Sequence, residues 1–256
     1  MVLLELKGLT KYFGGLAAVN DLDFSVDEGE IVGLIGPNGA GKTTVFNLIS
    51  GVFASTDGEI HFRGEEITGL RPDQVAKKGL ARTFQSTILF ELFPSVMNVV
   101  VGTHLHAGIN FFGTLFNTRR TRNKEQETLA KVMDIINFLE LGDWAQVPAQ
   151  DLPHGHQRAL GVAIALATEP KLLLLDEPVT GMNPEETIHM MGLIKKIRDE
   201  RNLTIVLVEH DMKAVMGLCD RISVLSFGKK LTEGTPEEIQ NDKAVIEAYL
   251  GVDEDV

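Results

Sequence analysis

Hydrophobic and polar residues alternate in the first part of the chain, which is the pattern of β-strands. Leu22, Phe24 and Val26 are separated by polar residues, and a short, mostly apolar run at 30–35 lies between two glycines. Alternation predicts a strand with one buried face, whereas an unbroken apolar run predicts a strand buried on both faces. We therefore expect residues 1–35 to form strands.

Glycines mark the ends of the next two predicted elements. Residues 42–50 predict a helix that ends at Gly51. Residues 58–68 read GEIHFRGEEIT and predict a hairpin that turns around Gly64.

From residue 94 to residue 168 the apolar positions follow a helical period. One helix face is predicted by apolar residues at i, i+3, i+4, i+7 and i+10, namely Leu129, Val132, Met133, Ile136 and Leu139. Beyond Pro170, strands return and alternate with helices. Strands are predicted at 172–178, 204–210 and 221–228, and helices at 184–200 and 211–218. Because the strand runs are apolar throughout, this alternation predicts a parallel sheet covered by helices.

Composition narrows the classes of protein that fit this pattern. The 256 residues carry a formal net charge of −12 and one cysteine, Cys219. An acidic chain is a poor partner for nucleic acid, because phosphate backbones bind basic surfaces. A lone cysteine excludes an internal disulfide and fits a reducing cytosol, and neither CxxC nor HExxH is present. No segment reaches the ~18 apolar residues that span a bilayer, and the N-terminus lacks the features of a signal peptide.

A phosphate-binding loop is the strongest chemical signal in the sequence. Residues 36–43 read GPNGAGKT and match GxxxxGK[ST] in full, between a predicted strand and a predicted helix. Glycines allow the backbone to wrap phosphates, and the N–H groups of the helix N-terminus attract them. We expect Lys42 to reach the β- and γ-phosphates and the Thr43 hydroxyl to bind Mg²⁺. The nucleotide-contacting residues of this loop are expected to be Gly36, Pro37, Asn38, Gly39, Ala40, Gly41, Lys42, Thr43 and Thr44.

Two carboxylates end the predicted strand at 172–178. Asp176 and Glu177 follow four leucines, and the carboxyl end of a parallel strand faces the crevice where ligands bind. We expect Asp176 to hold Mg²⁺ through water and Glu177 to act as general base on the attacking water. Acidic residues at a strand end are often only solvated, but the phosphate loop favours the catalytic interpretation.

With these motifs, the sequence resembles the ATP-binding subunits of ABC transporters, over essentially its whole length. The resemblance implies that Gln85 contacts Mg²⁺ and water and senses the transmembrane partner. It implies that His210 is the switch histidine at the γ-phosphate, and that Phe13, with Val19 beside it, stacks on adenine. Each residue alone also fits an ordinary surface or core position, so their order and spacing carry the assignment. The implied catalytic residues are Glu177, His210, Lys42 and Gln85, and the implied Mg²⁺ ligands are Thr43, Gln85 and Asp176.

The family's signature motif, LSGGQ, is altered in this chain. In its place stand Leu152, Pro153, His154, Gly155, His156 and Gln157. Pro153 replaces the serine that touches a γ-phosphate across the dimer, and proline lacks a backbone N–H. His154 replaces the first glycine, whereas Gly155 and the following helix N-terminus are kept, so anion attraction remains. Asn183 stands where the family has the aspartate of the D-loop.

Two segments make the resemblance more specific. The insert at 104–127 and the ending GTPEEIQNDKAVIEAYLG are similar to LivG-type ATPases of branched-chain amino-acid importers. Urea-import and lipopolysaccharide-export ATPases have similar endings and remain alternatives.

The insert itself has two interpretations. Its apolar residues are followed by basic ones, so it either lies near anionic headgroups or a membrane subunit, or forms a helical hairpin with a buried apolar side. These residues are Phe111, Phe112, Leu115, Phe116, Arg119, Arg120, Arg122 and Lys124.

The resemblance implies an α/β fold, with a P-loop NTPase (RecA-like) core, an N-terminal antiparallel β portion and an inserted α-helical subdomain. We expect a single ABC ATPase domain over residues 1–256. Within it we place the nucleotide-binding core at 1–87 and 161–234, the helical subdomain at 88–160 and a C-terminal helical tail at 235–256.

The implied cofactors are ATP and Mg²⁺. The implied partners are a second, LivF-type ATPase subunit in a head-to-tail dimer, two membrane permeases and a periplasmic binding protein, with no nucleic acid. The implied location is the cytoplasmic face of the inner membrane, as a peripheral subunit. Two other classes of protein also contain a phosphate loop. One is a soluble ABC protein that acts on nucleic acid or ribosomes, which the charge of −12 disfavours, and the other is a P-loop kinase or GTPase, which Gln85 and the Glu177-Pro178 pair disfavour.

Overall fold

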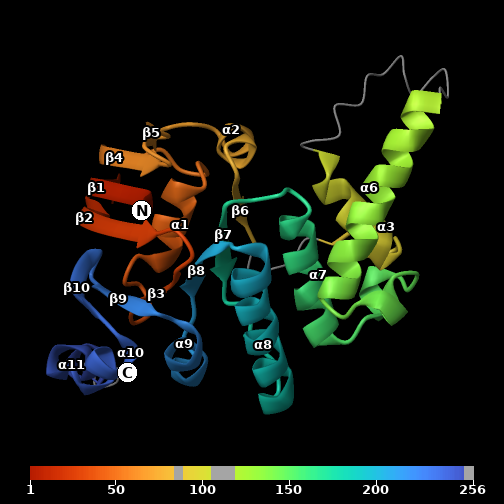
Figure 1. Ribbon diagram of the computed structural model, residues 1–256. Helices are drawn as coiled ribbons and strands as arrows, with labels where there is room; N and C mark the ends of the chain where they lie inside the picture. Colours follow the sequence, from red (N-terminus) through yellow and green to blue (C-terminus); the bar gives the residue numbers. More distant parts are fainter. Residues whose placement is uncertain (84–88, 105–118, 251–256) are drawn as a thin grey trace. The chain divides into compact units, whose positions relative to one another are not determined.

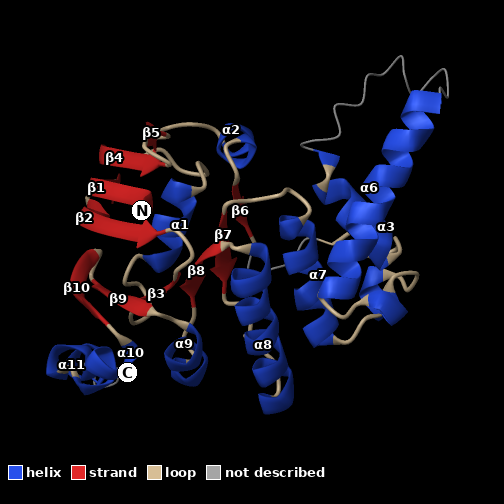
Figure 2. Cartoon of the chain, viewed as in Figure 1, coloured by secondary structure: helices blue, strands red, loops and turns tan. Residues whose placement is uncertain are grey.

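The structure is a computed structural model that describes residues 1–83, 89–104 and 119–250 (Figure 1). Residue contacts divide the chain into two units, Met1–Arg82 with Lys171–Val256, and Thr83–Pro170. The first unit combines strands and helices, and the described elements of the second are all helical (Figure 2). The helical unit therefore begins at residue 83 instead of 88 and ends at residue 170 instead of 160.

An antiparallel sheet opens the first unit. Its strands are β1 (Val2–Phe13), β2 (Leu16–Asp27), β4 (Asp57–Phe62) and β5 (Glu65–Glu66), in the order β2-β1-β4-β5. Arg63 and Gly64, the two residues between β4 and β5, both have positive φ, at 55° and 75°. A two-residue hairpin turn needs positive φ at both positions, which glycine adopts without strain. The hairpin predicted around Gly64 is confirmed.

A six-stranded sheet forms the centre of the same unit. It contains β3 (Ile31–Ile35), β6 (Leu80–Arg82), β7 (Leu172–Asp176), β8 (Thr204–Val208), β9 (Arg221–Ser226) and β10 (Lys229–Gly234), in the order β10-β9-β3-β8-β7-β6. All neighbours pair in parallel except β10, which is antiparallel to β9. Every residue of β3, β7 and β8 is buried. Burial on both faces explains their unbroken apolar runs and confirms the predicted parallel sheet.

Helices cover the six-stranded sheet. Helix α1 (Lys42–Ile49) places Val45 and Phe46 in one hydrophobic core with residues of β1, β4, β7 and β8, so this core joins the two sheets. On the other face, α9 (Met212–Leu218) packs close to β3, since a Cβ at Gly33 would lie 2.9 Å from the Cys219 sulfur. Helix α8 (Pro184–Arg201) contacts α9. The first unit also contains α2 (Pro72–Lys77), α10 (Pro236–Asn241) and α11 (Lys243–Leu250).

The helical unit is built on α3 (Ser95–Gly102), α6 (Arg119–Phe138) and α7 (His154–Leu166), with short 3-10 turns at Gly142–Trp144 and Ala149–Asp151. Helices α3 and α7 approach closely at Gly102, where a Cβ would lie 2.4 Å from the Ile164 carbonyl oxygen. Because α7 packs on α3 and α6, it belongs to this unit, and the boundary expected at residue 160 moves to 170.

The buried face predicted at α6 is confirmed at three of its five positions, and a fourth, Met133, is half-buried. Val132, Ile136 and Leu139 are buried, but Leu129 is 49% exposed, and Ile135 is buried instead. Most of the 104–127 insert lies outside the described residues, so the structure tests neither interpretation of this segment. None of the helices in the described part of the chain is both long and apolar enough to cross a membrane.

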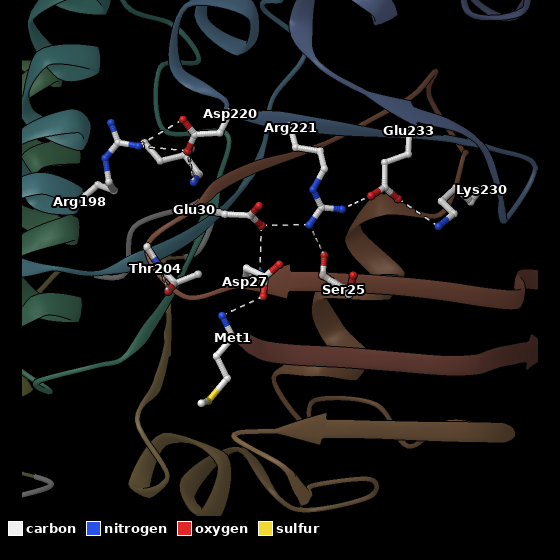
Figure 3. A network of polar contacts seen from close by, with 12 residues as sticks. Met1, Ser25, Asp27, Glu30, Arg198, Thr204, Asp220, Arg221, Lys230 and Glu233 are labelled. Carbon is white, nitrogen blue, oxygen red and sulfur yellow. Dashed lines mark hydrogen bonds and ion pairs between the residues drawn. The ribbon is translucent and has the colours of Figure 1, made fainter.

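A network of polar contacts fixes the amino ends of β3, β8 and β9 (Figure 3). The Arg221 guanidinium donates to the Ser25 carbonyl at 2.8 Å and to Glu30 Oε2 at 3.0 Å, and it also pairs with Glu233. Asp220 Oδ2 accepts the Ile31 N–H at 2.8 Å. These contacts hold the turn before β3 against β9 and β10. The carboxyl ends of the same strands lie at the opposite edge of the sheet.

Candidate functional site

The carboxyl ends of β3, β7 and β8 lie side by side and lead into the predicted site residues. Asp176 of β7 pairs in register with Val208 of β8, so the two strands end together. The chain leaves β3 into the phosphate loop, β7 into Glu177 and β8 into His210. In an open parallel sheet this edge is where ligands bind.

Glycines in the phosphate loop allow the backbone to pass close to neighbouring strands. A Cβ at Gly36 would lie 2.1 Å from the Leu225 carbonyl oxygen, and Gly41 has a φ of +105° with the Ala18 carbonyl oxygen 2.5 Å from its Cβ position. Another residue at either place would clash and be strained. The Gly228 N–H also donates to the Ala40 carbonyl at 3.0 Å, so the β9–β10 turn supports the loop.

Lys42 lies within the electrostatic reach of both carboxylates after β7. Its Nζ donates to the Gly36 carbonyl at 2.6 Å and to the Pro37 carbonyl at 3.0 Å. Burial lowers the pKa of the Lys42 ammonium, and the charges of Glu177 and Asp176 oppose that shift. Thr43 is exposed and Thr44 half-buried in the first turn of α1. The structure therefore brings the loop lysine and the two carboxylates to one place.

Replacing Lys42 by alanine should weaken ATP binding. A hydrogen bond to a charged group contributes ~1.5–3 kcal/mol, which corresponds to a loss of about 10- to 150-fold in affinity. Titration with a fluorescent ATP analogue measures the change. Lys77→Ala, at an exposed lysine of α2, is the matched control. Equal affinity for Lys42→Ala and wild type would contradict the assigned phosphate contact.

Asp176 forms a buried ion pair with Arg82, a residue that sequence reasoning missed. Arg82 Nη2 lies 2.9 Å from Asp176 Oδ2, and the two side chains are 6% and 7% exposed. Arg82 also donates to Asn47 Oδ1 at 2.7 Å and to Ser50 Oγ at 3.2 Å. The guanidinium thus ties β6, α1 and β7 together and fixes the Asp176 carboxylate. A buried carboxylate needs a cationic partner. An aspartate at the end of an apolar strand was therefore the signal for a buried basic residue nearby.

Replacing Arg82 by methionine should destabilise the fold by ~3–5 kcal/mol, because it removes one partner of a buried ion pair. Urea unfolding followed by circular dichroism measures the loss. The control is Arg71→Met, which removes a surface pair with Asp73 that is worth about 0–1 kcal/mol. A loss for Arg82→Met no larger than that of the control would show that the buried pair is not important for stability.

Glu177 and His210 approach each other at the ends of β7 and β8. Glu177 has a φ of +50°, a left-handed conformation that is uncommon outside glycine, and its N–H donates to the Val208 carbonyl at 2.8 Å. His210 Nδ1 lies 3.8 Å from Glu177 Oε1. The side chain of Glu177 is 22% exposed and that of His210 is 62% exposed. Both groups can therefore reach a water molecule or a phosphate placed at this edge.

Glu209, which lies between Val208 of β8 and His210, is a further acidic residue near this pair and was not predicted from the sequence. Its side chain has no exposed surface, and it accepts hydrogen bonds from the backbone N–H groups of Val179 and His210. The signal in the sequence is an acidic residue at the end of an apolar run, although the strand predicted at 204–210 includes this position.

The proposed adenine contacts differ in their exposure. Phe13 is 43% exposed, packs edge-to-face on Phe53 at 5.4 Å, and has the Lys11 Nζ 5.1 Å from its ring centre. Val19 is fully buried in the hydrophobic core, so its side chain supports this region from within and has no surface for a base. Gln85 lies outside the described residues.

The signature residues lie in the helical unit, at the start of α7. Pro153 precedes the helix, and no side chain caps it. Gln157 Nε2 donates to the Leu152 carbonyl at 3.1 Å, and the His156 ring lies 4.8 Å from the Trp144 ring. His154 is exposed. In the other unit, Asn183 caps α8 by accepting the N–H groups of Glu185 and Glu186, each at 3.0 Å.

The residues at this edge fit a magnesium ion that is shared with a nucleotide. Thr43 offers a hydroxyl and Asp176 a carboxylate, which are the hard oxygen ligands that Mg²⁺ prefers. Among the described residues no group of three or more histidines, cysteines or acidic residues could hold a metal ion. A Mg²⁺ site with few protein ligands is completed by phosphate oxygens and water.

Comparison with known proteins assigns the family. A family model described as "ABC transporter" matches residues 19–180, and another, described as "Branched-chain amino acid ATP-binding cassette transporter", matches residues 229–255. The high-affinity branched-chain amino acid transport ATP-binding protein BraF of Pseudomonas aeruginosa is 45% identical, over 97% of this chain and 98% of that protein. Its counterpart LivG of Escherichia coli strain K12 is 43% identical over the same shares.

Solved structures agree with this assignment. The ADP conformation of an ATP-binding cassette of an ABC transporter has a TM-score of 0.86 and 28% identity, covering 98% of this chain and 99% of that one. A dimeric bacterial ABC transporter cassette has a TM-score of 0.75 and 26% identity, covering 91% and 98%. These findings confirm the predicted P-loop fold and the resemblance noted from the sequence. The "ABC transporter" match covers more than half of the chain and includes the phosphate loop, Asp176 and Glu177, so this protein belongs to the ABC transporter family as an ATP-binding cassette.

Proposed function

We propose that this cassette hydrolyses ATP to power import of branched-chain or related amino acids through a separate pair of membrane permeases. The observation that carries this proposal is the match of residues 229–255 to the branched-chain cassette family. These residues include β10, α10 and α11, which lie outside the phosphate loop. The match therefore adds information beyond nucleotide binding, and the relatives named above are branched-chain amino acid transport proteins.

In the proposed reaction, the phosphate loop binds the ATP phosphates through backbone N–H groups and Lys42. Lys42 Nζ gives up its bonds to the Gly36 and Pro37 carbonyls and turns to the β- and γ-phosphates. A Mg²⁺ ion held by Thr43, Asp176 and Gln85 would supply charge neutralisation at the phosphates. Glu177 takes a proton from the attacking water, and His210 contacts the γ-phosphate. Phe13 offers its exposed ring face to adenine.

The proposed assembly is a head-to-tail dimer with a second, LivF-type cassette. In this arrangement the segment from Leu152 to Gln157 completes the ATP site of the partner, and the partner's signature completes the site on Lys42. A bacterial ABC transporter cassette that is 26% identical has a dimeric structure, which supports a dimer for this chain. ATP would favour the closed dimer, and hydrolysis would reopen it, because a ligand shifts an equilibrium toward the state it binds better.

An apolar surface of the helical unit supports contact with the permeases. Leu92 is 76% exposed, Phe90 and Phe93 are each 51% exposed, and Met97 of α3 is 47% exposed. The buried Asn98 shapes this segment, since it bonds to the N–H and the carbonyl of Phe90. An exposed apolar patch on a rigid support is typical of a protein interface. The complex would place this subunit at the cytoplasmic face of the inner membrane, with a periplasmic binding protein on the other side and no nucleic acid.

Uptake by the reconstituted transporter tests this function. The cassette, its partner ATPase and the two permeases are placed in proteoliposomes with ATP inside, and the binding protein with labelled substrate is added outside. We expect ATP-dependent uptake of leucine, isoleucine or valine, and none with Lys42→Ala. Uptake of urea alone would contradict the proposed cargo without contradicting ATP hydrolysis.

A further inference from the structure

Glu209 is a buried carboxylate that bonds within its own loop, which follows β8, and also to the loop that follows β7. Its side chain has no exposed surface. Oε1 accepts the Val179 N–H at 2.9 Å. Oε2 accepts the His210 N–H at 2.9 Å and the Asp211 N–H at 3.3 Å. All three bonds are accepted, which suits an ionised carboxylate.

The two loops carry the residues assigned to hydrolysis. Val179 lies two residues after Glu177, on the loop that leaves β7, and His210 follows Glu209 on the loop that leaves β8. The strands themselves pair only as far as Asp176 and Val208, and the Glu177 N–H still bonds to the Val208 carbonyl at 2.8 Å. Beyond that point the two loops no longer follow the strand ladder. The Glu209 carboxylate continues the connection between them.

Within the described residues, the basic group nearest to this carboxylate is the imidazole that it helps to place. His210 Nδ1 lies 3.8 Å from Glu209 Oε2 and 3.8 Å from Glu177 Oε1. No lysine or arginine of the described chain lies within 4.0 Å of Glu209 as an ion-pair partner. Backbone N–H groups therefore provide the hydrogen bonds to this buried carboxylate. Burying a carboxylate costs free energy unless these hydrogen bonds all form.

We propose that Glu209 is a positioning residue that clamps the Glu177 loop to the His210 loop and so sets the geometry of hydrolysis. The proposal rests on the roles proposed above for Glu177 and His210. The clamp acts through backbone groups and does not touch the nucleotide. It predicts a loss in turnover without a matching loss in nucleotide binding, which the phosphate loop provides independently.

Glutamine at this position is the sharpest test, because it keeps the shape and loses one acceptor. In Glu209→Gln the amide oxygen can face one loop, and the NH₂ group must then face an N–H donor of the other. One loop therefore loses its bond. A displacement of about 1 Å in a catalytic group can cost about 10²-fold, so we expect kcat to fall about 10- to 100-fold. The ATP dissociation constant should stay within about threefold of wild type.

The measurements are steady-state ATPase activity of the assembled transporter, ATP-analogue binding and thermal unfolding. Glu238→Gln is the matched control, because Glu238 also accepts a backbone N–H, from Thr235 at 2.8 Å, but lies exposed in α10. The control should keep full activity. A kcat for Glu209→Gln within about twofold of wild type would overturn the proposal, as would equal losses in kcat and ATP affinity.

Combination with His210→Ala tests whether Glu209 acts through its neighbours. If the clamp positions His210, Glu209→Gln should cost less in the His210→Ala background than in wild type. Full multiplication of the two losses would show independent action and overturn the clamp. Full activity of both Glu177→Gln and His210→Ala would instead refute the roles proposed for those residues, and the clamp with them.

Folding failure of Glu209→Gln would not end the test. Glu209→Asp keeps the charge but is one methylene shorter, so it cannot bond to both loops. It should lower kcat at unchanged ATP affinity. Full activity of Glu209→Asp, or the failure of both variants to fold, would place Glu209 in overall stability and overturn its positioning role.

Discussion

Glu177→Gln should lower steady-state ATP hydrolysis by about 10²–10⁴-fold while ATP remains bound, because it removes a general base and leaves the phosphate loop intact. The glutamine has nearly the same volume, so the left-handed backbone at residue 177 and its bond to the Val208 carbonyl should persist. His210, 3.8 Å away, keeps its place but has no base to assist. The expected product is a closed, ATP-bound dimer.

Two measurements separate lost chemistry from lost structure. Phosphate release from the assembled transporter gives kcat, and size-exclusion chromatography with Mg-ATP detects the trapped dimer. Glu185→Gln, an exposed carboxylate in the first turn of α8, is the control and should behave as wild type. Wild-type turnover in Glu177→Gln would exclude this residue as the base. A loss of ATP binding equal to the loss of turnover would mean that the substitution damaged the site.

Strands that are buried on both faces were predictable from sequence, and exposed or very short strands were not. β3, β7 and β8 are apolar at nearly every position because helices cover both sides. β10 reads KKLTEG and has no buried residue, and β6 has three residues, so neither carries a periodic signal. Both form strands because a neighbouring strand offers them hydrogen bonds. That pairing depends on the tertiary structure and leaves no periodic pattern in the sequence.

The site residues also separate into those that the sequence predicted and those that it did not. Lys42, Asp176 and Glu177 belong to local motifs, so their proximity follows from parallel strands that end at one edge. Arg82 and Asp176 are 94 residues apart in sequence, and Glu209 and Val179 are 30 apart. Contacts between residues so far apart in the sequence cannot be predicted from a local sequence pattern. The family resemblance supplied Val19 as an adenine contact, but its full burial could be known only from the packing of β2.

The altered signature predicts two unequal ATP sites in the dimer. The residues proposed to act on this chain's own nucleotide, including Lys42, Asp176 and His210, are all present in the sequence. The segment that would complete the partner's site contains Pro153, which brings neither a hydroxyl nor an N–H. A lost donor to a developing charge costs ~2.7–4 kcal/mol, or about 10²–10³-fold in rate. We therefore expect the site on this chain's phosphate loop to carry most of the hydrolysis.

Separate substitutions in the two cassettes measure the asymmetry. Glu177→Gln here should remove most of the ATPase activity of the heterodimer, and the equivalent substitution in the partner should remove much less. Pro153→Ser in this chain should then raise the activity of the partner's site, because it restores both donors at the start of α7. Gly155 and the helix N-terminus remain to attract phosphate in every variant.

Three results would contradict this asymmetry. Equal losses from the two glutamate substitutions would mean that the sites are obligately coupled or that the exposed imidazole of His154 replaces the missing donors. His154→Gly distinguishes these two explanations, since it should lower activity only if the imidazole is a donor. A Pro153→Ser variant with unchanged turnover at the partner's site would show that the serine hydroxyl is not limiting. If substitution of the partner's glutamate removed more ATPase activity than Glu177→Gln, the partner's site would be the more active one. The intact phosphate loop of this chain would then serve ATP binding more than turnover.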